Sequence, residues 1–270
     1  MSEQIVLPFL KWAGGKRWLV RDHPDIFPAD FNTYIEPFLG SGSVFFHMQP
    51  KKALLSDANK ELIITYQALR NRNRKVESLL KRYHACHSEE FYYFMRGQEP
   101  KKQEEIAARM IYLNRTCWNG LYRVNLSGRF NVPKGTKKNV ILDTDNFKET
   151  ARLLRRSKIV HSDFEKIIDS AQENDFVFVD PPYTVKHNLN GFVKYNEKLF
   201  SWDDQVRLKL AIDRATARGA KVLLTNADHE SILSLYDNYI SRNTLSRNSV
   251  LSGKSEFRGE FSELTIKCWI

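Results

Sequence analysis

A continuous apolar run, Phe176–Val179, restricts the possible folds of this chain more than any other feature. Strands that are covered on both faces, as in parallel sheets, read as unbroken apolar runs, whereas a strand with one solvated face alternates. The run stops at Asp180-Pro181-Pro182-Tyr183. Because ligands of open α/β sheets bind beyond the carboxyl ends of the strands, these four residues are a candidate site.

A strand–helix–strand–helix pattern near the N-terminus supports a parallel sheet. Residues 33–36 read as a strand that runs into the glycine-rich turn 37–42, and residues 43–49 start a helix. Residues 53–57 read as the second strand, and Asn59 is a candidate N-cap for a long amphipathic helix. The apolar face of that helix is formed by Leu62, Ile63, Tyr66 and Leu69.

Strand patterns return in the second half of the chain, after a different middle segment. Strands are expected at residues 158–163, 176–180, 221–225, 239–245 and 263–269, and a helix is expected at 203–218. A polar loop with Gly253 and Gly259 separates the last two strands and is expected to be mobile. The chain therefore reads as one α/β sheet domain, residues 1–70 and 158–270, with an inserted lobe at residues 71–157.

The inserted lobe is mainly helical in pattern and strongly basic. Residues 70–158 contain 21 Lys and Arg against 9 Asp and Glu, whereas the whole chain has a formal net charge of +10. The excess is confined to this one segment, which indicates a polyanionic partner such as nucleic acid. A merely solvated basic face is the alternative. A turn-rich stretch at residues 125–133 is consistent with a hairpin.

Several classes of protein do not fit the sequence. No apolar run approaches the roughly 20 residues of a membrane-spanning helix, and the N-terminus lacks the features of a signal peptide. The three cysteines, Cys86, Cys117 and Cys268, are scattered and form no CxxC pair. The stretch 84–87 looks like a ligand cluster, but no second cluster accompanies it, so a helix end is the better interpretation. We expect a soluble, intracellular protein without a metal site.

The segment Asp180-Pro181-Pro182-Tyr183 suits chemistry on a planar amine. The lone pair of an aryl amine is delocalised into its ring, so the nitrogen is a poor nucleophile. The Asp180 carboxylate and the Pro181 carbonyl can accept hydrogen bonds from the two N–H groups and draw the nitrogen towards tetrahedral geometry. The Tyr183 ring offers a stacking face for a base that has left its helix. An ordinary strand followed by a Pro-Pro turn is the alternative.

Three further features have the character of cofactor contacts. Glycines in Glu36–Gly42 let the backbone approach a ligand closely, and the absence of a full GxGxxG pattern argues against a dinucleotide. Asp57 closes the next strand, where an acid can accept hydrogen bonds from ribose hydroxyls, although an acid at a helix N-terminus would look the same. Phe9–Lys16 combines aromatic residues, two glycines and two lysines, which favours a tight loop facing an anion or a cofactor.

Together and in this order, these segments resemble the Dam-type DNA adenine-N6 methyltransferases of the alpha group, in which target recognition lies between the cofactor motifs and the DPPY motif. The resemblance extends over nearly the whole chain, and its motifs are residues 9–16, 113–123, 130–133 and 180–183. It implies a Rossmann-like, S-adenosylmethionine-dependent methyltransferase sheet with an inserted helical target-recognition domain. It also implies a site-specific enzyme that methylates a flipped adenine in double-stranded DNA without a metal.

The resemblance implies roles for individual residues. The catalytic positions are Asp180, Pro181 and Tyr183. The cofactor-binding positions are Trp12, Lys16, Glu36, Phe38, Gly40, Ser41, Asp57, Asp163, Phe164 and Asp180. The DNA-binding positions are Lys11, Trp118, Asn119, Leu121, Arg123, Asn131 and Pro133.

The DNA-binding positions suggest a GATC-like target. Arg123 matches a residue that reads a guanine through its O6 and N7 acceptors, and Lys11 matches a further guanine contact. Leu121 and Pro133 match apolar base contacts. Trp118 departs from the tyrosine that is common in the family but keeps an aromatic wedge. The resemblance further suggests a monomer or weak dimer that is cytoplasmic and associated with DNA.

Two other interpretations remain open. A methyltransferase that acts on another planar amine, an RNA adenine or a protein glutamine, often carries N-P-P-Y, and a glutamine substrate would not explain the basic lobe. An inactive DNA-binding regulator on the same scaffold is expected to carry a damaged D-P-P-Y segment or cofactor loop, and both are intact in this sequence.

Overall fold

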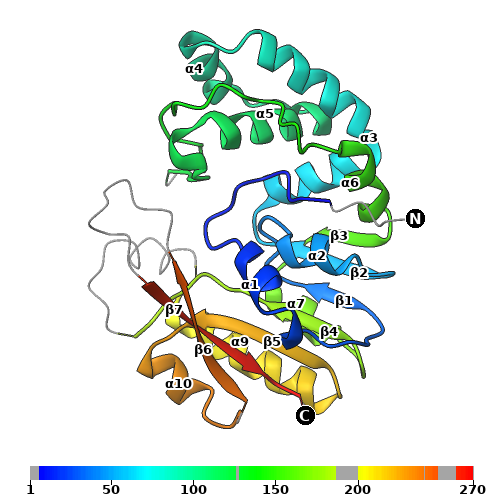
Figure 1. Cartoon of the computed structure of the whole chain (residues 1–270), viewed down its shortest axis with the longest axis vertical. Helices are drawn as coiled ribbons and strands as arrows, with labels where there is room; N and C mark the ends of the chain where they lie inside the picture. The colour runs from blue at the N-terminus through cyan, green and yellow to red at the C-terminus, as the bar shows by residue number, and fades with distance from the viewer. Residues whose placement is uncertain (1–5, 126–127, 187–199, 240, 249–259, 270) are drawn as a thin grey trace. The chain divides into compact units, whose positions relative to one another are not determined.

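The computed structural model describes residues 6–125, 128–186, 200–239, 241–248 and 260–269 (Figure 1). The chain divides into two compact units. The first unit comprises Met1–Asp22, Leu39–Lys51 and Asp57–His161, and the second comprises His23–Phe38, Lys52–Ser56 and Ser162–Ile270. No helix within the described ranges is long and apolar enough to cross a membrane.

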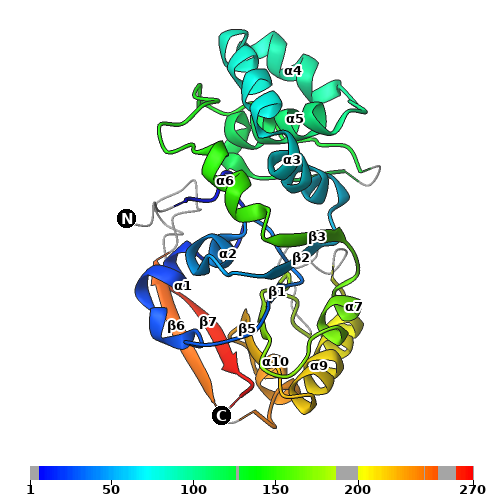
Figure 2. The same cartoon turned by 90° about the vertical axis from the view of Figure 1, so that its right-hand side faces the viewer.

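The first unit is mainly helical. Its elements are α1 (Arg17–Asp22), α2 (Ser43–Met48), α3 (Lys60–Ala85), α4 (Glu89–Gly97), α5 (Gln103–Thr116), the 3-10 helix η2 (Trp118–Gly120), α6 (Phe147–Leu154) and the strand β3 (Ser157–His161). Helix α3 packs against α5 and α6, and α4 packs against α5 (Figure 2). The described residues between 71 and 157 are thus mainly helical, as the sequence predicts.

The longest helix, α3, follows its sequence pattern. The Asn59 side chain accepts a hydrogen bond from the Leu62 N–H at 3.0 Å, which satisfies one of the donors that a first helical turn leaves without a partner. The predicted apolar face is buried, since its four residues are at most 1% exposed. At Arg72 the backbone leaves helical geometry (φ −138°, ψ 27°), so α3 is kinked. The expected lobe boundary between residues 70 and 71 falls inside this helix.

The second unit is built on a mixed sheet. Its strands are β1 (Tyr34–Glu36), β2 (Ala53–Asp57, of which Asp57 is counted with the first unit), β4 (Phe176–Val179), β5 (Lys221–Ala227), β6 (Arg242–Asn248) and β7 (Glu260–Lys267). They follow the order β2-β1-β4-β5-β7-β6. Strands β2, β1, β4 and β5 are parallel neighbours, whereas β7 runs antiparallel to β5 and β6. This mixed α/β architecture agrees with the expected Rossmann-like sheet.

The helices of the second unit are the 3-10 helix η1 (Pro24–Ile26), α7 (Phe164–Asp169), α9 (Trp202–Ala217) and α10 (Glu230–Leu235). Helices α7 and α9 pack side by side, and α9 also packs on β5 (Figure 2). A capping box begins α9, because the Ser201 side chain accepts from the Asp204 N–H while the Asp204 carboxylate accepts from the Ser201 N–H.

Strand β4 lies between two parallel neighbours, as its apolar run predicts. Phe176 aligns with Tyr34 of β1, and Val179 aligns with Leu224 of β5. All four β4 residues are at most 2% exposed. Each such side chain contributes about 1.5–3 kcal/mol when it leaves water, so this strand anchors the sheet. Asp180 follows directly, at the carboxyl end of the parallel strands.

The expected start of the penultimate strand is wrong. The sequence predicts a strand from Tyr239, but β6 begins at Arg242. The Tyr239 N–H instead donates to the Tyr236 carbonyl, and its hydroxyl donates to Asp213 Oδ1 at 2.7 Å. Asp213 lies on α9, so the partner that holds Tyr239 in a turn is remote in sequence, and local β-propensity could not reveal it.

Two further strand bounds differ from the prediction to the same extent: β6 ends at Asn248 and not at residue 245, and β7 begins at Glu260 and not at residue 263. The remaining strand bounds agree to within two residues. The polar loop with Gly253 and Gly259 lies outside the described residues.

Candidate functional site

Asp180, at the end of β4, is oriented by a threonine of the neighbouring strand. The hydroxyl of Thr225, which is 0% exposed on β5, donates a hydrogen bond to Asp180 Oδ1 at 2.7 Å. A hydrogen bond to an ionised carboxylate is stronger than one between neutral groups, and it restricts the carboxylate to one orientation. Asp180 itself remains partly exposed. The arrangement gives a positioned acceptor at the edge of the sheet where α/β proteins bind ligands.

Tyr183 is held by a buried acid from the C-terminal part of the chain. Its hydroxyl donates to Glu263 Oε2 at 2.8 Å, and Glu263 lies on β7 with 3% of its surface exposed. Burial, followed by the charges of Asp180 and Glu263, raises the pKa of Tyr183 well above its ordinary value. The phenol therefore stays protonated and donates to the acid. With its hydroxyl fixed, the ring has one defined orientation for stacking.

The sequence analysis missed both Thr225 and Glu263. Thr225 had a readable signal, because it ends the predicted strand 221–225 and parallel strands present their carboxyl ends at one edge. Glu263 had none, because a single acid in a predicted strand carries no information about a partner 80 residues away.

Phe38, Phe164 and Phe200 form an aromatic cluster in the second unit. The rings of Phe38 and Phe164 stack at a centroid distance of 5.4 Å and an interplanar angle of 24°, and Phe200 packs against both, at 5.7 and 5.5 Å. Asp163 precedes Phe164 and caps α7, because its Oδ1 accepts from the Glu165 N–H at 2.9 Å. This aromatic cluster, in which Phe164 is 6% exposed, thus lies beside a carboxylate that is 43% exposed.

Glu36, at the end of β1, is buried and bonded. Its Oε2 accepts a hydrogen bond from the Tyr34 hydroxyl at 2.9 Å, and 3% of the residue is exposed. Burial and the charge of Glu36 raise the pKa of Tyr34 well above its ordinary value. A buried acid at a strand end is a plausible partner for a cationic ligand group, since it has already lost most of its contact with water.

In the first unit, Asp57 organises the glycine-rich turn. Its Oδ2 accepts from the Gly40 N–H at 3.0 Å, and its Oδ1 accepts from the Asn59 N–H at 2.8 Å. Burial raises the pKa of Asp57, and these two N–H groups oppose that rise. Gly40 has a φ of +47°, and a Cβ on it would come within 2.9 Å of Trp12 Cδ1. A side chain at residue 40 would therefore displace Trp12, which is why the turn needs glycine.

Lys16 and Ser41 belong to the same part of the first unit. Lys16 is 3% exposed, and its Nζ donates to the Gly14 carbonyl at 2.7 Å. Ser41 is 7% exposed and shares a hydrogen bond with Ser43 at 2.9 Å. A pocket of about 640 Å³ in this unit is lined by residues that include Lys11, Trp12, Ser41, Asn114, Lys137 and Lys138. Partial burial and the charge of Lys137 lower the pKa of Lys11.

Two contacts tie the N-terminal loop to the segment that carries the expected DNA contacts. The Trp12 ring stacks on Tyr122 at 5.3 Å and 21°. The Asn114 side chain accepts from the Lys11 N–H at 2.9 Å and donates to the carbonyls of Lys11 and Gly120 at 2.7 and 3.3 Å. Lys11 and Trp12, expected to touch DNA and cofactor respectively, are thus fixed by the same segment.

The expected DNA-contact residues are mostly exposed. Trp118 is 54% exposed, and Asn119, which follows it, adopts a φ of +55°. Arg123 is exposed, and its Nε donates to Asn131 Oδ1 at 3.0 Å. An antiparallel bridge between Val124 and Phe130 supports the expected hairpin, of which residues 126–127 lie outside the described structure.

Leu121 and Pro133 complete the expected DNA-contact set. Leu121 is partly exposed and Pro133 is exposed, and the Pro133 carbonyl accepts from the Trp118 N–H at 2.9 Å. The stretch 84–87 lies at the end of α3, where Cys86 is exposed. Among the residues that the structure describes, no three His, Cys, Asp or Glu side chains are grouped so that they could hold a metal ion.

The expected site residues are divided between the two units. Trp12, Lys16, Gly40, Ser41 and Asp57 lie in the first unit with all the expected DNA contacts. The second unit contains Glu36, Phe38, Asp163, Phe164, Asp180, Pro181 and Tyr183. Each unit therefore carries part of the expected cofactor contacts, and the catalytic segment belongs to the second unit.

Comparison with known families identifies the family to which the chain belongs. Residues 12–250 match the D12 class N6 adenine-specific DNA methyltransferases. The chain belongs to this family. It is therefore an enzyme that methylates adenine in DNA at N6, and membership implies S-adenosylmethionine as the methyl donor.

Individual relatives extend over most of this D12-class chain. It is 35% identical to the Type II methyltransferase M1.LlaDCHI of Lactococcus lactis subsp. cremoris over 96% of its own length and 94% of that protein. It is 36% identical to the Type II methyltransferase M.MjaIII of Methanocaldococcus jannaschii over 82% and 84%. It is 32% identical to a DNA adenine methylase of Vibrio cholerae serotype O1 over 90% and 92%.

Proposed function

We propose that this D12-class methyltransferase is a Dam-type enzyme that transfers a methyl group from S-adenosylmethionine to a flipped adenine in duplex DNA. Its target is a GATC-like sequence, and it acts as a monomer or weak dimer. The observation that carries the proposal is the pair of fixed groups after β4: Asp180 bonded to Thr225, and Tyr183 bonded to Glu263. A planar amine needs both an acceptor for its N–H groups and a face to stack on.

Each unit, taken by itself, has residues that suit parts of S-adenosylmethionine. Phe164, which is 6% exposed and stacks on the partly exposed Phe38, belongs to an aromatic wall for an adenine ring, and Asp163 beside it offers a partly exposed acceptor for an exocyclic amino group. Asp57 is the acceptor for ribose hydroxyls, and the glycine turn at residue 40 lets the backbone come close. The amino acid end of the cofactor carries an amino group and a carboxylate. Glu36 suits the cationic amino group, and Lys16 suits the carboxylate. When bound, the cofactor supplies a methyl group that is already activated on a sulfonium sulfur.

Asp180 and the Pro181 carbonyl act on the adenine amino group. Each oxygen accepts a hydrogen bond from one N–H of the adenine amino group. These two bonds draw the nitrogen towards tetrahedral geometry and make its lone pair available. Thr225 keeps the Asp180 carboxylate aimed, and Tyr183 stacks on the flipped base. Because these groups are oriented before the base arrives, little reorganisation is needed during the reaction.

The basic lobe supplies DNA affinity in this proposal. Lysine and arginine contacts to phosphates give salt-dependent binding to any sequence. Arg123, exposed and steadied by Asn131, reads a guanine, and Lys11 makes a second guanine contact. Leu121 and Pro133 make apolar base contacts, and the Trp118–Asn119 pair occupies the place that the flipped base leaves.

The Asp180→Ala variant tests the catalytic assignment. We expect methyl transfer to a GATC duplex to fall by about two to three orders of magnitude, the loss seen when one preorganised hydrogen-bonding group is removed from an active site. Affinity for the same duplex should stay within about threefold, because the phosphate contacts lie in the basic lobe. The measurement is transfer of a labelled methyl group at saturating cofactor, with DNA affinity measured separately by fluorescence anisotropy.

Asp237→Ala is the matched control, because Asp237 is an exposed aspartate of the same unit. Near-wild-type methylation by Asp180→Ala would contradict the catalytic role proposed for this segment. Equal transfer to single-stranded DNA or RNA would favour another planar amine as substrate. Mapping of methylated adenines in a plasmid checks the GATC-like target, and sedimentation of the full chain with and without duplex checks the oligomeric state.

A further inference from the structure

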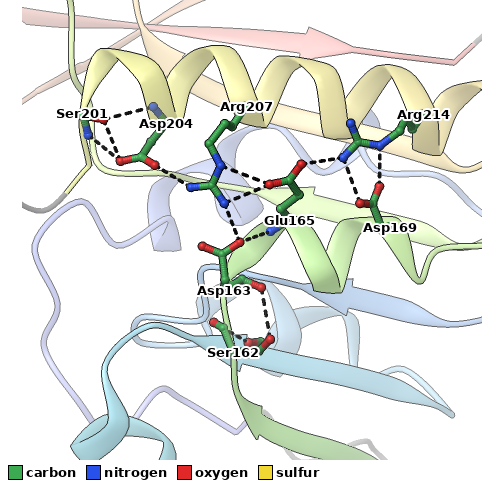
Figure 3. Close-up of polar contacts among 9 residues, drawn as sticks. Ser162, Asp163, Glu165, Asp169, Ser201, Asp204, Arg207 and Arg214 are labelled. Carbon is green, nitrogen blue, oxygen red and sulfur yellow. Dashed lines mark hydrogen bonds and ion pairs between the residues drawn. The ribbon is translucent and has the colours of Figure 1, made fainter.

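Arg207 on α9 bonds carboxylates from three places in the second unit (Figure 3). Its Nη2 donates to Asp163 Oδ1 at 3.0 Å, and its Nε and Nη2 donate to Glu165 Oε2 at 3.1 and 2.9 Å. Its Nη1 donates to Asp204 Oδ1 at 2.7 Å. A guanidinium is a rigid fork, so three partners determine its position more closely than one ion pair would.

The same guanidinium touches both residues that the proposed function assigns to the cofactor adenine. Asp163 Oδ1, which bonds Arg207, also accepts from the Glu165 N–H that starts α7. The Arg207 guanidinium also lies 4.9 Å from the centroid of the Phe164 ring. A cation at that distance attracts the face of an aromatic ring. Arg207 thus restrains an acceptor and a ring that are adjacent in the chain.

Arg207 is itself held by the start of its helix. Asp204, which accepts from Arg207 through Oδ1, accepts through Oδ2 from the Ser201 N–H and hydroxyl, both at 2.9 Å. Phe200, directly before this capping box, packs on Phe164 at 5.5 Å. The beginning of α9 therefore contacts the expected adenine site through both a ring and a charge.

Arg214 provides a comparison within the same helix. It bonds Glu165 Oε1 at 2.9 Å and Asp169 through two nitrogens at 2.8 and 2.9 Å (Figure 3). Its side chain is 43% exposed and that of Arg207 is 42% exposed. Within the described part of the chain, Arg214 bonds neither Asp163 nor Phe164. The two arginines thus lie on the same helix, are equally exposed and both bond Glu165. Only Arg207 of the two contacts the residues expected to bind the adenine.

We propose that Arg207 is a positioning residue for the cofactor adenine: it holds Asp163 and Phe164 in the orientation that recognises the amino group and the face of the ring. This inference rests on the proposed function, in which those two residues contact the adenine. Arg207 contacts neither cofactor nor DNA in this role and acts only through its neighbours.

The test compares Arg207→Met with Arg214→Met in the full chain. The probes are S-adenosylhomocysteine and S-inosylhomocysteine, which carry an amino group and an oxo group, respectively, at the same ring position. Isothermal titration calorimetry gives both dissociation constants. The wild type should prefer the adenosyl compound by about tenfold or more, because a site built for an N–H donor rejects an analogue without it. Arg207→Met should weaken adenosyl binding by about tenfold and lose most of the preference, since a site whose support is removed loses its geometry.

Arg214→Met should keep the preference and bind the adenosyl compound within about twofold of the wild type, because it removes exposed ion pairs alone. Both variants should lower the melting temperature to a similar extent. Arg207→Lys, which retains a charge without the fork, should recover part of the preference. In methylation assays, Arg207→Met should raise the KM for S-adenosylmethionine far more than it lowers kcat.

Three results would overturn the inference. Retention of the full preference by Arg207→Met would leave the arginine a structural residue only. An equal loss of the adenosyl preference in Arg214→Met would show that the effect comes from the stability of the helix and not from positioning. A wild type without any preference would reject the placement of the cofactor adenine at Asp163 and with it this inference. None of the three outcomes bears on methyl transfer at Asp180, so the proposed function is tested separately by Asp180→Ala.

Discussion

The end of strand β4 and the loop that follows η2 are both expected to touch DNA, but they are built in opposite ways. At the end of β4, Asp180 and Tyr183 are each held by a buried side chain of another strand. Trp118 on η2 is exposed, and so is Arg123 in the loop, where its neighbour Asn131 accepts a hydrogen bond from it. The groups expected to do chemistry are held by remote strands, whereas those expected to read a sequence project from a 3-10 helix and a short hairpin.

This difference has a physical reason. Catalysis gains from groups that are oriented before the substrate arrives, and buried hydrogen bonds supply that order. Sequence reading needs side chains that reach base edges, and these must remain accessible until DNA binds. A substitution in the loop can therefore change the target without disturbing the core, whereas a substitution behind Asp180 or Tyr183 should affect any substrate equally.

Thr225→Val is the sharpest way to challenge this contrast. Loss of the hydroxyl removes the hydrogen bond to Asp180, and we expect kcat to fall on the order of a hundredfold, because hydrogen bonds to charged groups are worth about 1.5–3 kcal/mol. Single-turnover methylation measures the effect. The matched control is Thr265→Val, since Thr265 is the buried ladder partner of Thr225 on β7 and its hydroxyl donates to the Asn243 carbonyl. Equal losses in the two variants would contradict a specific role for Thr225.

Arg123→Met addresses the loop. We expect discrimination against a substituted guanine at one position to fall by about tenfold, within the 1–3 kcal/mol that a bidentate arginine contributes. Transfer to non-cognate duplexes should change little. Arg129→Met is the control, because Arg129 is a neighbouring exposed arginine that pairs with Glu99 at 3.1 Å. Competition between cognate and substituted duplexes supplies the measurement. A uniform loss over all sequences would make Arg123 a phosphate contact instead.

Trp118→Tyr should have the smallest effect of the three. The ring is exposed, so its exchange does not disturb the core, and a tyrosine keeps an aromatic wedge. We expect kcat/KM to change by less than about threefold, whereas Trp118→Ala should lose about tenfold because stacking on a base is worth about 1–3 kcal/mol. Steady-state methylation of one duplex compares both variants. If Tyr and Ala variants behaved alike, the indole would have a function that aromatic stacking does not explain.

Short-range patterns were sufficient for most of the framework. The Asn59 cap depends on a hydrogen bond to a residue three positions away, and the apolar run of β4 needs no knowledge of its partners. The motifs of the expected active site are likewise contiguous in the chain. What local patterns could not provide is exemplified by Tyr239, whose expected strand is replaced by a turn because its hydroxyl bonds Asp213 on α9.

The family, its chemistry and the strand that carries Asp180 could thus be read from the chain, because apolar runs, caps and motif order are encoded in neighbouring residues. Only the tertiary structure could reveal which groups hold the site in place. Thr225 is 45 residues from Asp180, Glu263 is 80 residues from Tyr183, and Arg207 is 44 residues from Asp163. Hydrogen bonds of such span depend on how strands and helices pack, and that packing is a property of the whole fold.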